Sequence, residues 1–318
     1  MGNCVNTARR ATQNFTSEDL ESVLYNYSYS EEDYNDLDYG ATPCHSSFCP
    51  TFGNSIPAFF ATVCALGLLA NAALGVALHK RPSLQSRAVL SLMALASAIF
   101  AVAMSFFAAG FSSGWSFGEG SCQVAQALWY GSLFAQGLVV AGGALQAKWS
   151  RPSWCLTWVF FAAGFALAVP AGIESKHTDG VCFLSRITPL TSWRLAHVLC
   201  CLAVFLLLPL ALGTAKVVLW WQRSSWEPPV NMTWFFFFFW APYGLAVLLD
   251  ALAERLSFVS TCTSLKTLDY FLGLSEGLGI LHCCCLGILL LWGQLTSTGS
   301  YLVPTKTGAV SSNKNLEP

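Results

Sequence analysis

The stretch Leu202-Ala203-Val204-Phe205-Leu206-Leu207-Leu208 lies between Arg194 and Lys216, an interval without any charged residue. Its apolar residues run continuously, without the two-residue alternation that marks the strands of a membrane barrel. The interval holds the roughly 20 apolar residues with which a helix crosses about 30 Å of hydrocarbon. The stretch therefore predicts a membrane-spanning helix.

The same pattern recurs along the chain. Six intervals are free of charge, and a seventh apolar stretch, from about Thr267 to Leu291, has one internal carboxylate, Glu276. We expect spans at 57–78, 88–110, 122–146, 154–173, 195–216, 232–251 and 267–292. The fold class is then an all-α membrane protein, a seven-transmembrane helix bundle over 57–292, preceded by a polar tail at 1–56 and followed by a cytoplasmic tail at 293–318.

The composition supports a membrane protein. Of 318 residues, 54% are apolar and only 10% are charged, and the mean hydropathy is +0.53. A water-soluble domain usually carries about 25% charged residues, so a soluble globular protein is excluded. With 16 basic and 17 acidic residues, the chain lacks the basic excess of a nucleic-acid binder.

The loop after the first span predicts the orientation. Lys80, Arg81 and Arg87 lie beside the membrane there, and loops rich in Lys and Arg stay in the cytoplasm. We therefore expect an extracellular N-terminus, with glycosylation at the sequons of Asn14 and Asn26. The start of the chain, Met1-Gly2-Asn3-Cys4-Val5-Asn6, is polar and shows no cleavable signal peptide, so the first span would target the chain.

The N-terminal tail is acidic and rich in tyrosine. Its eight carboxylates against two arginines give a net charge of −6, and Asp38 and Tyr39 lie in its most membrane-proximal acidic part. One interpretation is a solvated stalk. The other is an arm that captures a basic soluble protein, with tyrosines such as Tyr29 and Tyr39 placed beside carboxylates like the targets of sulfotransferases.

Carboxylates also occur inside the predicted spans. Asp250, Asp269 and Glu276 lie in the outer third of the last two spans, and Asp269 and Glu276 share one helix face because they are seven residues apart. An intramembrane carboxylate is costly and marks a polar cavity or a partner. The alternative is pairing with a helix-end cation such as Arg255 or Lys266.

The outer cysteines predict disulfides. The extracellular side is oxidising, but the sequence alone leaves the pairing open. Five cysteines fall near the outer side: Cys44, Cys49, Cys122, Cys182 and Cys262. The remaining cysteines, apart from Cys4, lie in or beside spans, where thiols are usually small apolar side chains.

No catalytic, metal or cofactor site is expected. The five histidines show no metal-ligand spacing, and no nucleophile elbow or phosphate loop is present. We interpret His282 as a satisfied core histidine, Phe235–Phe239 as lipid-facing bulk, and Ala141-Gly142-Gly143-Ala144 as a helix-packing face. The chain is therefore not expected to be an enzyme.

Several positions resemble those of rhodopsin-type receptors, and more narrowly of chemokine receptors. They are Asn71 in the first span, Trp158 in the fourth, Pro209 in the fifth, Trp240-Ala241-Pro242 in the sixth and Glu276 in the seventh. Five short motifs resemble the Duffy-type atypical chemokine receptors over nearly the whole chain: Met1-Gly2-Asn3-Cys4, Asp38-Tyr39-Gly40-Ala41, Pro43-Cys44-His45-Ser46, Trp129-Tyr130-Gly131-Ser132 and Ile280-Leu281-His282-Cys283.

The resemblance implies partners and sites. It implies disulfides Cys122–Cys182 and Cys44–Cys262, with Cys49 left over. It implies binding of basic secreted chemokines at the plasma membrane, with passage through early and recycling endosomes. The chemokine-binding residues would be Tyr29, Asp38, Tyr39, Asp250, Asp269 and Glu276. Whether the receptor forms homo- or hetero-oligomers is left open.

Three departures from the signalling receptors predict silence toward G proteins. The place of the Asp-Arg-Tyr triplet holds Gln146-Ala147-Lys148, Ser97 stands near the expected Asp of the second span, and Leu286-Gly287-Ile288-Leu289-Leu290 replaces Asn-Pro-x-x-Tyr. Together with these departures, the resemblance implies a receptor that binds many chemokines and sequesters, internalises or transports them without activating a G protein. A conventional G-protein-coupled receptor is the main alternative, and a transporter, which would need internal repeats or midplane charges, is the second.

Overall fold

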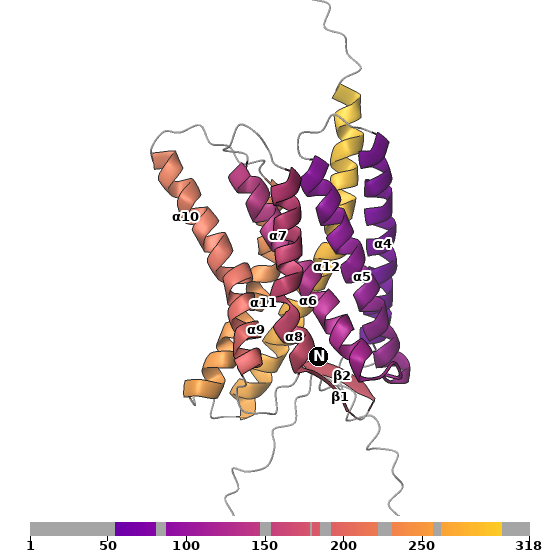
Figure 1. The fold of residues 1–318 in the computed structure, drawn as a ribbon, viewed down its shortest axis with the longest axis vertical. Coiled ribbons are helices and arrows are strands. Elements are labelled where there is room, and N and C mark those ends of the chain that lie inside the picture. The colour runs from indigo at the N-terminus through magenta and orange to yellow at the C-terminus, as the bar shows by residue number, and fades with distance from the viewer. Residues whose placement is uncertain are drawn as a thin grey trace, which may run out of the picture.

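A computed structural model describes residues 55–80, 87–146, 154–178, 180–184, 192–221, 231–256 and 262–300 (Figure 1). Within these ranges, seven helical segments are long and apolar enough to cross a membrane. Their elements are α4 (Ile56–Lys80), α5 (Arg87–Ser113), α6 (Glu119–Gln146), α7 (Trp154–Leu167) with α8 (Val169–Glu174), α9 (Ser192–Leu202) with η3 (Ala203–Leu207) and α10 (Leu208–Trp221), α11 (Asn231–Leu256), and α12 (Cys262–Ser300).

The seven-helix bundle predicted from the charge-free intervals is confirmed. The helices extend past the predicted ends, most of all α12, which continues from the expected 292 to Ser300. Charges limit how much of a helix can lie in lipid, whereas helical structure can continue into water. The span limits therefore mark the hydrocarbon rather than the helix ends.

Two spans are irregular because of proline. In the fourth span, α7 ends before Pro170, and the Ala168 and Ala171 amides donate to carbonyls three residues back, at Phe165 and Ala168. In the fifth span, the π-helical segment η3 ends two residues before Pro209. A proline has no N–H to continue the helical ladder, so the neighbouring turn adjusts its hydrogen bonds.

The third span, α6, is the central helix of the bundle. Of the 18 consecutive residues of α6 with the highest hydropathy, 78% are buried inside the bundle. This burial explains why the helix tolerates polar side chains such as Gln126, Ser132 and Gln136. Helix α7 approaches it closely at Gly164, where a Cβ atom would clash with the backbone of Ala135. Small residues permit such approaches between membrane helices.

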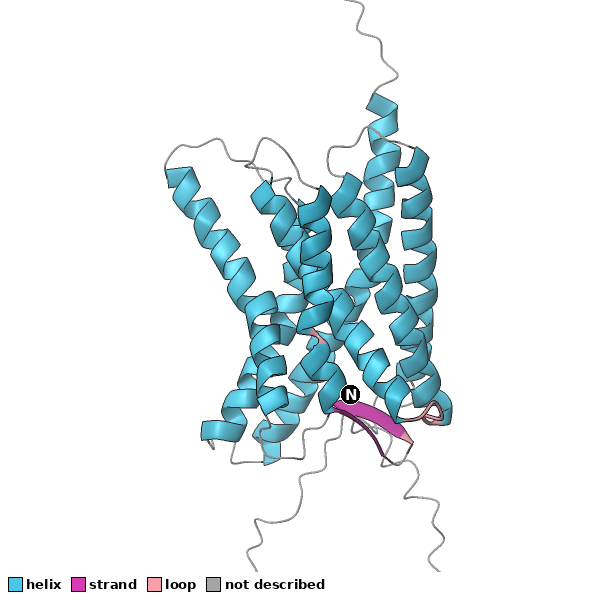
Figure 2. Cartoon of the chain, in the orientation of Figure 1, coloured by secondary structure: helices cyan, strands magenta, loops and turns pink. Residues whose placement is uncertain are grey.

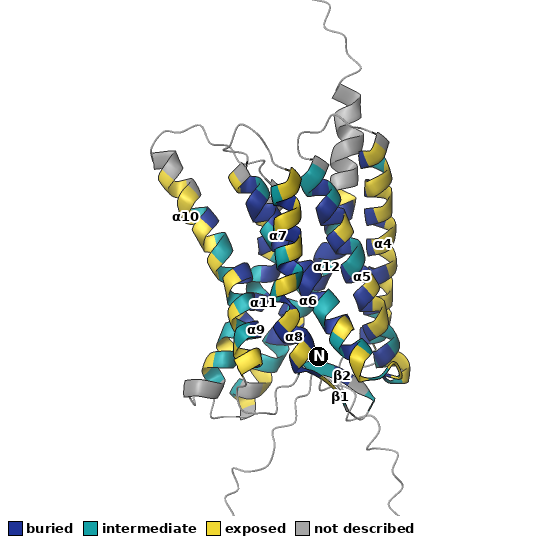
Figure 3. Ribbon diagram, in the orientation of Figure 1, coloured by how far each residue is buried: buried dark blue, intermediate teal, exposed yellow. Residues whose placement is uncertain are grey.

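Exposed residues occur along the helices on the outside of the bundle (Figure 3), and many of them are large apolar residues. Large residues such as Leu69, Val159 and Leu210 are exposed on the outer surface, as expected for contact with lipid tails. The interpretation of Phe235–Phe239 as lipid-facing bulk is only partly right. Phe238 is 69% exposed, but Phe236 and Phe237 are buried and belong to the core, because five successive helical residues point all round the helix axis.

Two short strands complete the described fold. β1 (Ser175–Thr178) and β2 (Val181–Leu184) form an antiparallel hairpin in which Ser175 faces Leu184. The hairpin lies at one end of the bundle, which we call the hairpin end (Figure 2). Helices α4, α6, α9 and α12 begin at this end, and α5, α8 and α11 end there (Figure 1).

Candidate ligand-binding site

The hairpin is fixed to the third span by a disulfide. Cys122, in the first turn of α6, is bonded to Cys182 in β2, with an S–S distance of 2.04 Å. This confirms the first of the two disulfides implied by the resemblance. The bond ties the hairpin to the first turn of the central helix.

The α5–α6 connection supports the hairpin from the other side. The Trp115 amide donates a hydrogen bond of 2.6 Å to the Gly180 carbonyl, and the His177 Nε2 lies 3.1 Å from the Trp115 carbonyl. Gly180 has φ of 71°, a conformation that favours glycine in a tight turn. Trp115 is itself buried, so the hairpin contacts a residue that is packed into the core.

The three carboxylates predicted from the sequence lie in the helices next to this end. Asp250 precedes the end of α11 by six residues, about 9 Å along the helix, and Asp269 lies at a similar depth after the start of α12. Glu276 lies two turns deeper, on the same face of the continuous helix as Asp269. All three side chains are half-buried.

A polar layer lies at the depth of Glu276. The hydroxyls of Tyr130 in α6 and Tyr243 in α11 are 2.9 Å apart, and Tyr243 lies within electrostatic range of Glu276. The Tyr130 ring packs edge-on against His197 of α9, with 4.4 Å between centroids, and the His197 Nε2 lies 3.6 Å from the Cys201 Sγ. Four spans therefore contribute to one layer.

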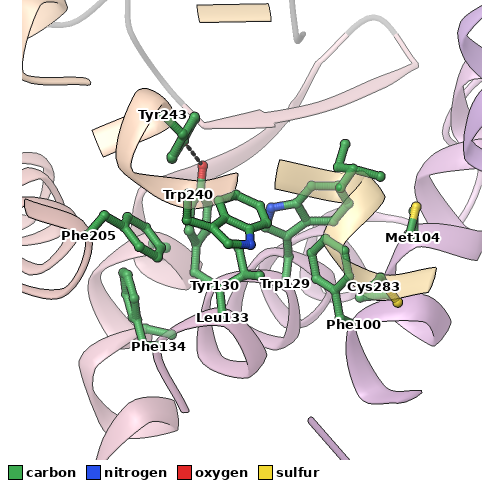
Figure 4. Close-up of a cluster of buried hydrophobic side chains, with 14 of the residues drawn as sticks. Phe100, Met104, Trp129, Tyr130, Leu133, Phe134, Phe205, Trp240, Tyr243 and Cys283 are labelled. Carbon is green, nitrogen blue, oxygen red and sulfur yellow. Dashed lines mark hydrogen bonds between the residues drawn. The ribbon is translucent and has the colours of Figure 1, made fainter. Parts of the chain in front are cut away.

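Aromatic side chains fill the space next to this layer, and Figure 4 shows them as one cluster. Trp240 stacks on Phe205 at 5.6 Å and meets Phe100 edge-on at 6.2 Å. Phe100 also contacts Trp129, with 4.6 Å between centroids. These side chains are buried and belong to the main core of the bundle.

Toward the opposite end, the interior polar contacts of the described chain involve uncharged groups. The Ser97 hydroxyl donates to Oε1 of Gln136 at 3.3 Å. The Asn71 side-chain amide donates to the carbonyls of Gly67 and Cys283. After Glu276, α12 has no Asp, Glu, Lys or Arg before its end at Ser300. The charged groups of the seventh span are thus confined to the half nearer the hairpin.

Several predicted residues lie outside the described residues. These are Asn14, Asn26, Tyr29, Asp38, Tyr39, Cys44, Cys49, Ala147 and Lys148. Helix α12 begins at Cys262, whose side chain is not described, so the pairing of Cys44 with Cys262 stays a prediction.

The interpretation of His282 as a satisfied core histidine is only partly right. His282 is buried as expected, but its Nε2 has no hydrogen-bond partner in the described part of the chain, and Phe235, Phe236 and Phe239 surround its ring. The helix-packing face at Ala141–Ala144 is confirmed, since Ala141 and Ala144 are buried in the core. Among the described residues, no three His, Cys, Asp or Glu side chains gather as a metal site.

The sequence did not point to Tyr130, His197 and Tyr243 as members of one layer. Tyr130 and Tyr243 lie in apolar spans at least seven residues from any charged residue, and His197 lies three residues after Arg194 at the start of an apolar span. Glu174 and Arg194 are also buried near the hairpin end, at the junctions of α8 and α9 with the loop between them. An ionisable residue close to a span boundary is the one signal that could have identified these two.

The fold and the site define a membrane protein of the seven-helix receptor class. No family model matches the chain. It is similar to Atypical chemokine receptor 1 of Homo sapiens, with 34% identity over 91% of this chain and 90% of the relative. It is also similar to the proteins of the same name from Macaca mulatta and Bos taurus, each with 33% identity, over 91% and 88% of this chain.

The chain belongs to the atypical chemokine receptor 1 family. Its seven spans and its receptor relatives make it a multi-pass protein of the plasma membrane. The resemblance deduced from short motifs is confirmed by identity that extends over most of the chain.

Proposed function

We propose that this protein is a non-signalling chemokine receptor. It binds a broad set of basic chemokines at the cell surface through its extracellular tail and the hairpin end. It then carries them into early and recycling endosomes without activating a G protein. The observation that best supports this proposal is the distribution of charge in the bundle. The intramembrane carboxylates lie in the half of the bundle nearer the hairpin, and the interior polar contacts described beyond them involve uncharged groups.

Ligand capture follows from two acidic regions. The tail has a net charge of −6, which attracts basic proteins over a distance, and sulfation of Tyr29 and Tyr39 would make it more negative. Asp250, Asp269 and Glu276 form a second region, half-buried and supported by the Tyr130–Tyr243 layer. Contacts based mainly on charge require little shape matching, which suits a broad ligand range.

We infer that the protein does not activate G proteins because it lacks polar residues with which signalling receptors switch between states. A receptor with two states needs polar groups whose pairing differs between them. Here Ala147 stands in place of the arginine of the triplet, and Ser97 is hydrogen-bonded to Gln136 where a carboxylate is expected. A conventional G-protein-coupled chemokine receptor is the alternative function, and it would have to signal without these groups.

The second disulfide belongs to the same proposal. A bond between Cys44 and Cys262 would tie the end of the acidic tail to the start of α12, which also carries Asp269 and Glu276. The arm would then be held over the carboxylates. Peptide mapping that placed Cys262 with Cys49, or found its thiol free, would contradict this pairing.

Neutralising the three carboxylates tests the binding site. The combined variant Asp250→Asn, Asp269→Asn and Glu276→Gln should weaken chemokine binding by at least about tenfold, equivalent to ~1.4 kcal/mol. The control is Glu119→Gln, which removes an exposed carboxylate at the same end of the bundle, at the first residue of α6. Equal affinities for the triple variant and the control would exclude these carboxylates as the binding site.

A further inference from the structure

A histidine and a cysteine lie side by side on one face of the fifth span. His197 and Cys201 are four residues apart on α9, so their side chains are neighbours on the helix surface. The His197 Nε2 is 3.6 Å from the Cys201 Sγ, and both residues are buried. The Tyr130 ring packs edge-on against the imidazole and limits its rotation. Because the second member is a cysteine, the spacing of histidines in the sequence does not reveal this pair.

The separation of the two atoms suits a shared metal ion. In tetrahedral zinc sites the Zn–N distance is about 2.0–2.1 Å and the Zn–S distance about 2.3 Å, which puts the nitrogen and the sulfur about 3.5–3.6 Å apart. The His197 Nε2 and the Cys201 Sγ already have this separation. The same separation suits a hydrogen bond between the thiol and the imidazole, so a metal titration has to separate the two.

The charges around the pair favour a cation on balance. Tyr243 lies within electrostatic range of both Cys201 and Glu276, so a thiolate and a carboxylate belong to one neighbourhood. A divalent cation at the pair would offset this negative charge. Arg194, three residues before His197 on α9, is also buried and opposes a cation. We therefore expect weaker binding than at a closed zinc site.

The helix is irregular directly after the pair. The π-helical segment η3 begins at Ala203, two residues after Cys201. Such segments are rare and occur frequently at functional sites. This irregularity is independent of the separation between the two side chains, and it too favours a ligand site at this point of the fifth span.

We propose that His197 and Cys201 bind a zinc ion, with the His197 Nε2 and the Cys201 Sγ as its protein ligands. Among the described residues, no group of three His, Cys, Asp or Glu side chains forms a metal site, so the ion keeps open positions for water or a small ligand. The sulfur binds as a thiolate, and its proton passes to solvent. Zinc accepts nitrogen and thiolate ligands and has no redox chemistry that would oxidise the thiol. The site does not depend on the proposed function.

Cobalt spectroscopy of the full chain in lipid nanodiscs tests the site. Co²⁺ accepts the same ligands as Zn²⁺, and a cobalt–thiolate bond gives a charge-transfer band in the near ultraviolet. The band should appear in the wild type and in Cys200→Ala, the control that removes the neighbouring half-buried thiol. It should be absent in Cys201→Ala. Zn²⁺ should remove the band by displacing Co²⁺, because zinc binds such ligands more tightly.

Thermal unfolding gives a second test, in which each variant is compared with its own metal-free state, so a less stable variant remains informative. An ion that binds only the folded chain raises the unfolding temperature. His197→Phe keeps an aromatic ring beside Tyr130 but removes the nitrogen ligand. It should need at least about tenfold more Zn²⁺ for the same rise, since even an outer-shell substitution typically costs about that factor in metal affinity.

Three results would each overturn the proposal. A cobalt band that persists in Cys201→Ala would place the thiolate ligand elsewhere in the chain. An equal response of wild type and His197→Phe to Zn²⁺ would exclude the imidazole as a ligand. Absence of the band in the wild type would show that the two side chains share only a hydrogen bond.

Discussion

The hydroxyl of Tyr130 in α6 lies 2.9 Å from the hydroxyl of Tyr243 in α11, and both side chains are buried (Figure 4). The bond joins the central helix to the helix that carries Asp250. It also places a phenol within electrostatic range of Glu276. The carboxylates near the hairpin end therefore lie next to a layer of side chains, including Tyr130 and Tyr243, that come from different spans and contact one another.

Removing either hydroxyl of this pair should destabilise the bundle. Tyr130→Phe or Tyr243→Phe leaves the other hydroxyl buried without this bond, at a cost of about 1–3 kcal/mol. The double variant should lose less than the sum of the two, by roughly 0.5 kcal/mol or more, because its members share one interaction. Thermal unfolding of the four proteins in nanodiscs measures this coupling, and strictly additive losses would show that the two hydroxyls act independently.

Loss of the Cys122–Cys182 disulfide should lower stability without preventing membrane insertion. The bond closes a loop between residues 60 positions apart, and opening such a loop costs about 2–4 kcal/mol. Cys122→Ser should therefore lower the unfolding temperature, and reducing agent should lower it less in this variant than in the wild type, which has both proposed disulfides to lose. Cys155→Ser, which removes an exposed free thiol, is the control and should match the wild type.

The close contact between α6 and α7 should not accept a methyl group. Gly164→Ala places a Cβ atom against the backbone of Ala135 and should cost about 1–3 kcal/mol. Gly120→Ala has open space around its Cβ atom and lies in the first turn of α6, so it should be neutral or slightly stabilising. Equal unfolding temperatures for the two variants would show that α7 can move away from α6.

Capture by the tail should depend on salt. Exposed charges are screened within roughly 8 Å at physiological ionic strength, so added salt should slow chemokine association more than it speeds dissociation. Tyr39→Phe should reduce affinity for only some chemokines. A variant that combines Tyr39→Phe with neutralised tail carboxylates should bind chemokines more slowly. If its association rate were unchanged for every chemokine, the tail would act only as a solvated stalk and would not capture ligand.

The spans could be predicted because hydrocarbon imposes a strong constraint on sequence, and charge-free intervals show it directly. The hairpin at Ser175–Leu184 was missed although a signal was present: Asp179-Gly180 separates two four-residue segments, which is the typical sequence of a two-residue hairpin turn. The π-helical segment at Ala203–Leu207 has no comparable signature beyond the nearby Pro209.

Of the candidate site, only the charged residues could be predicted from the sequence. Asp250, Asp269 and Glu276 stand out because an intramembrane carboxylate is costly. Tyr130, His197 and Tyr243 are aromatic residues in apolar spans, and their sequence positions are far apart, so only helix packing brings them together. Burial of Phe236 and Phe237 likewise depends on which face of α11 meets the core.

Binding and signalling measured together in the same cells test the central proposal most directly. Cells expressing the full chain would receive fluorescent chemokine while calcium and cyclic AMP are recorded, with a conventional chemokine receptor for the same ligand as the positive control. Saturable binding and uptake into vesicles without a calcium or cyclic-AMP response is the predicted result. A pertussis-toxin-sensitive response comparable to that of the control receptor would contradict the account.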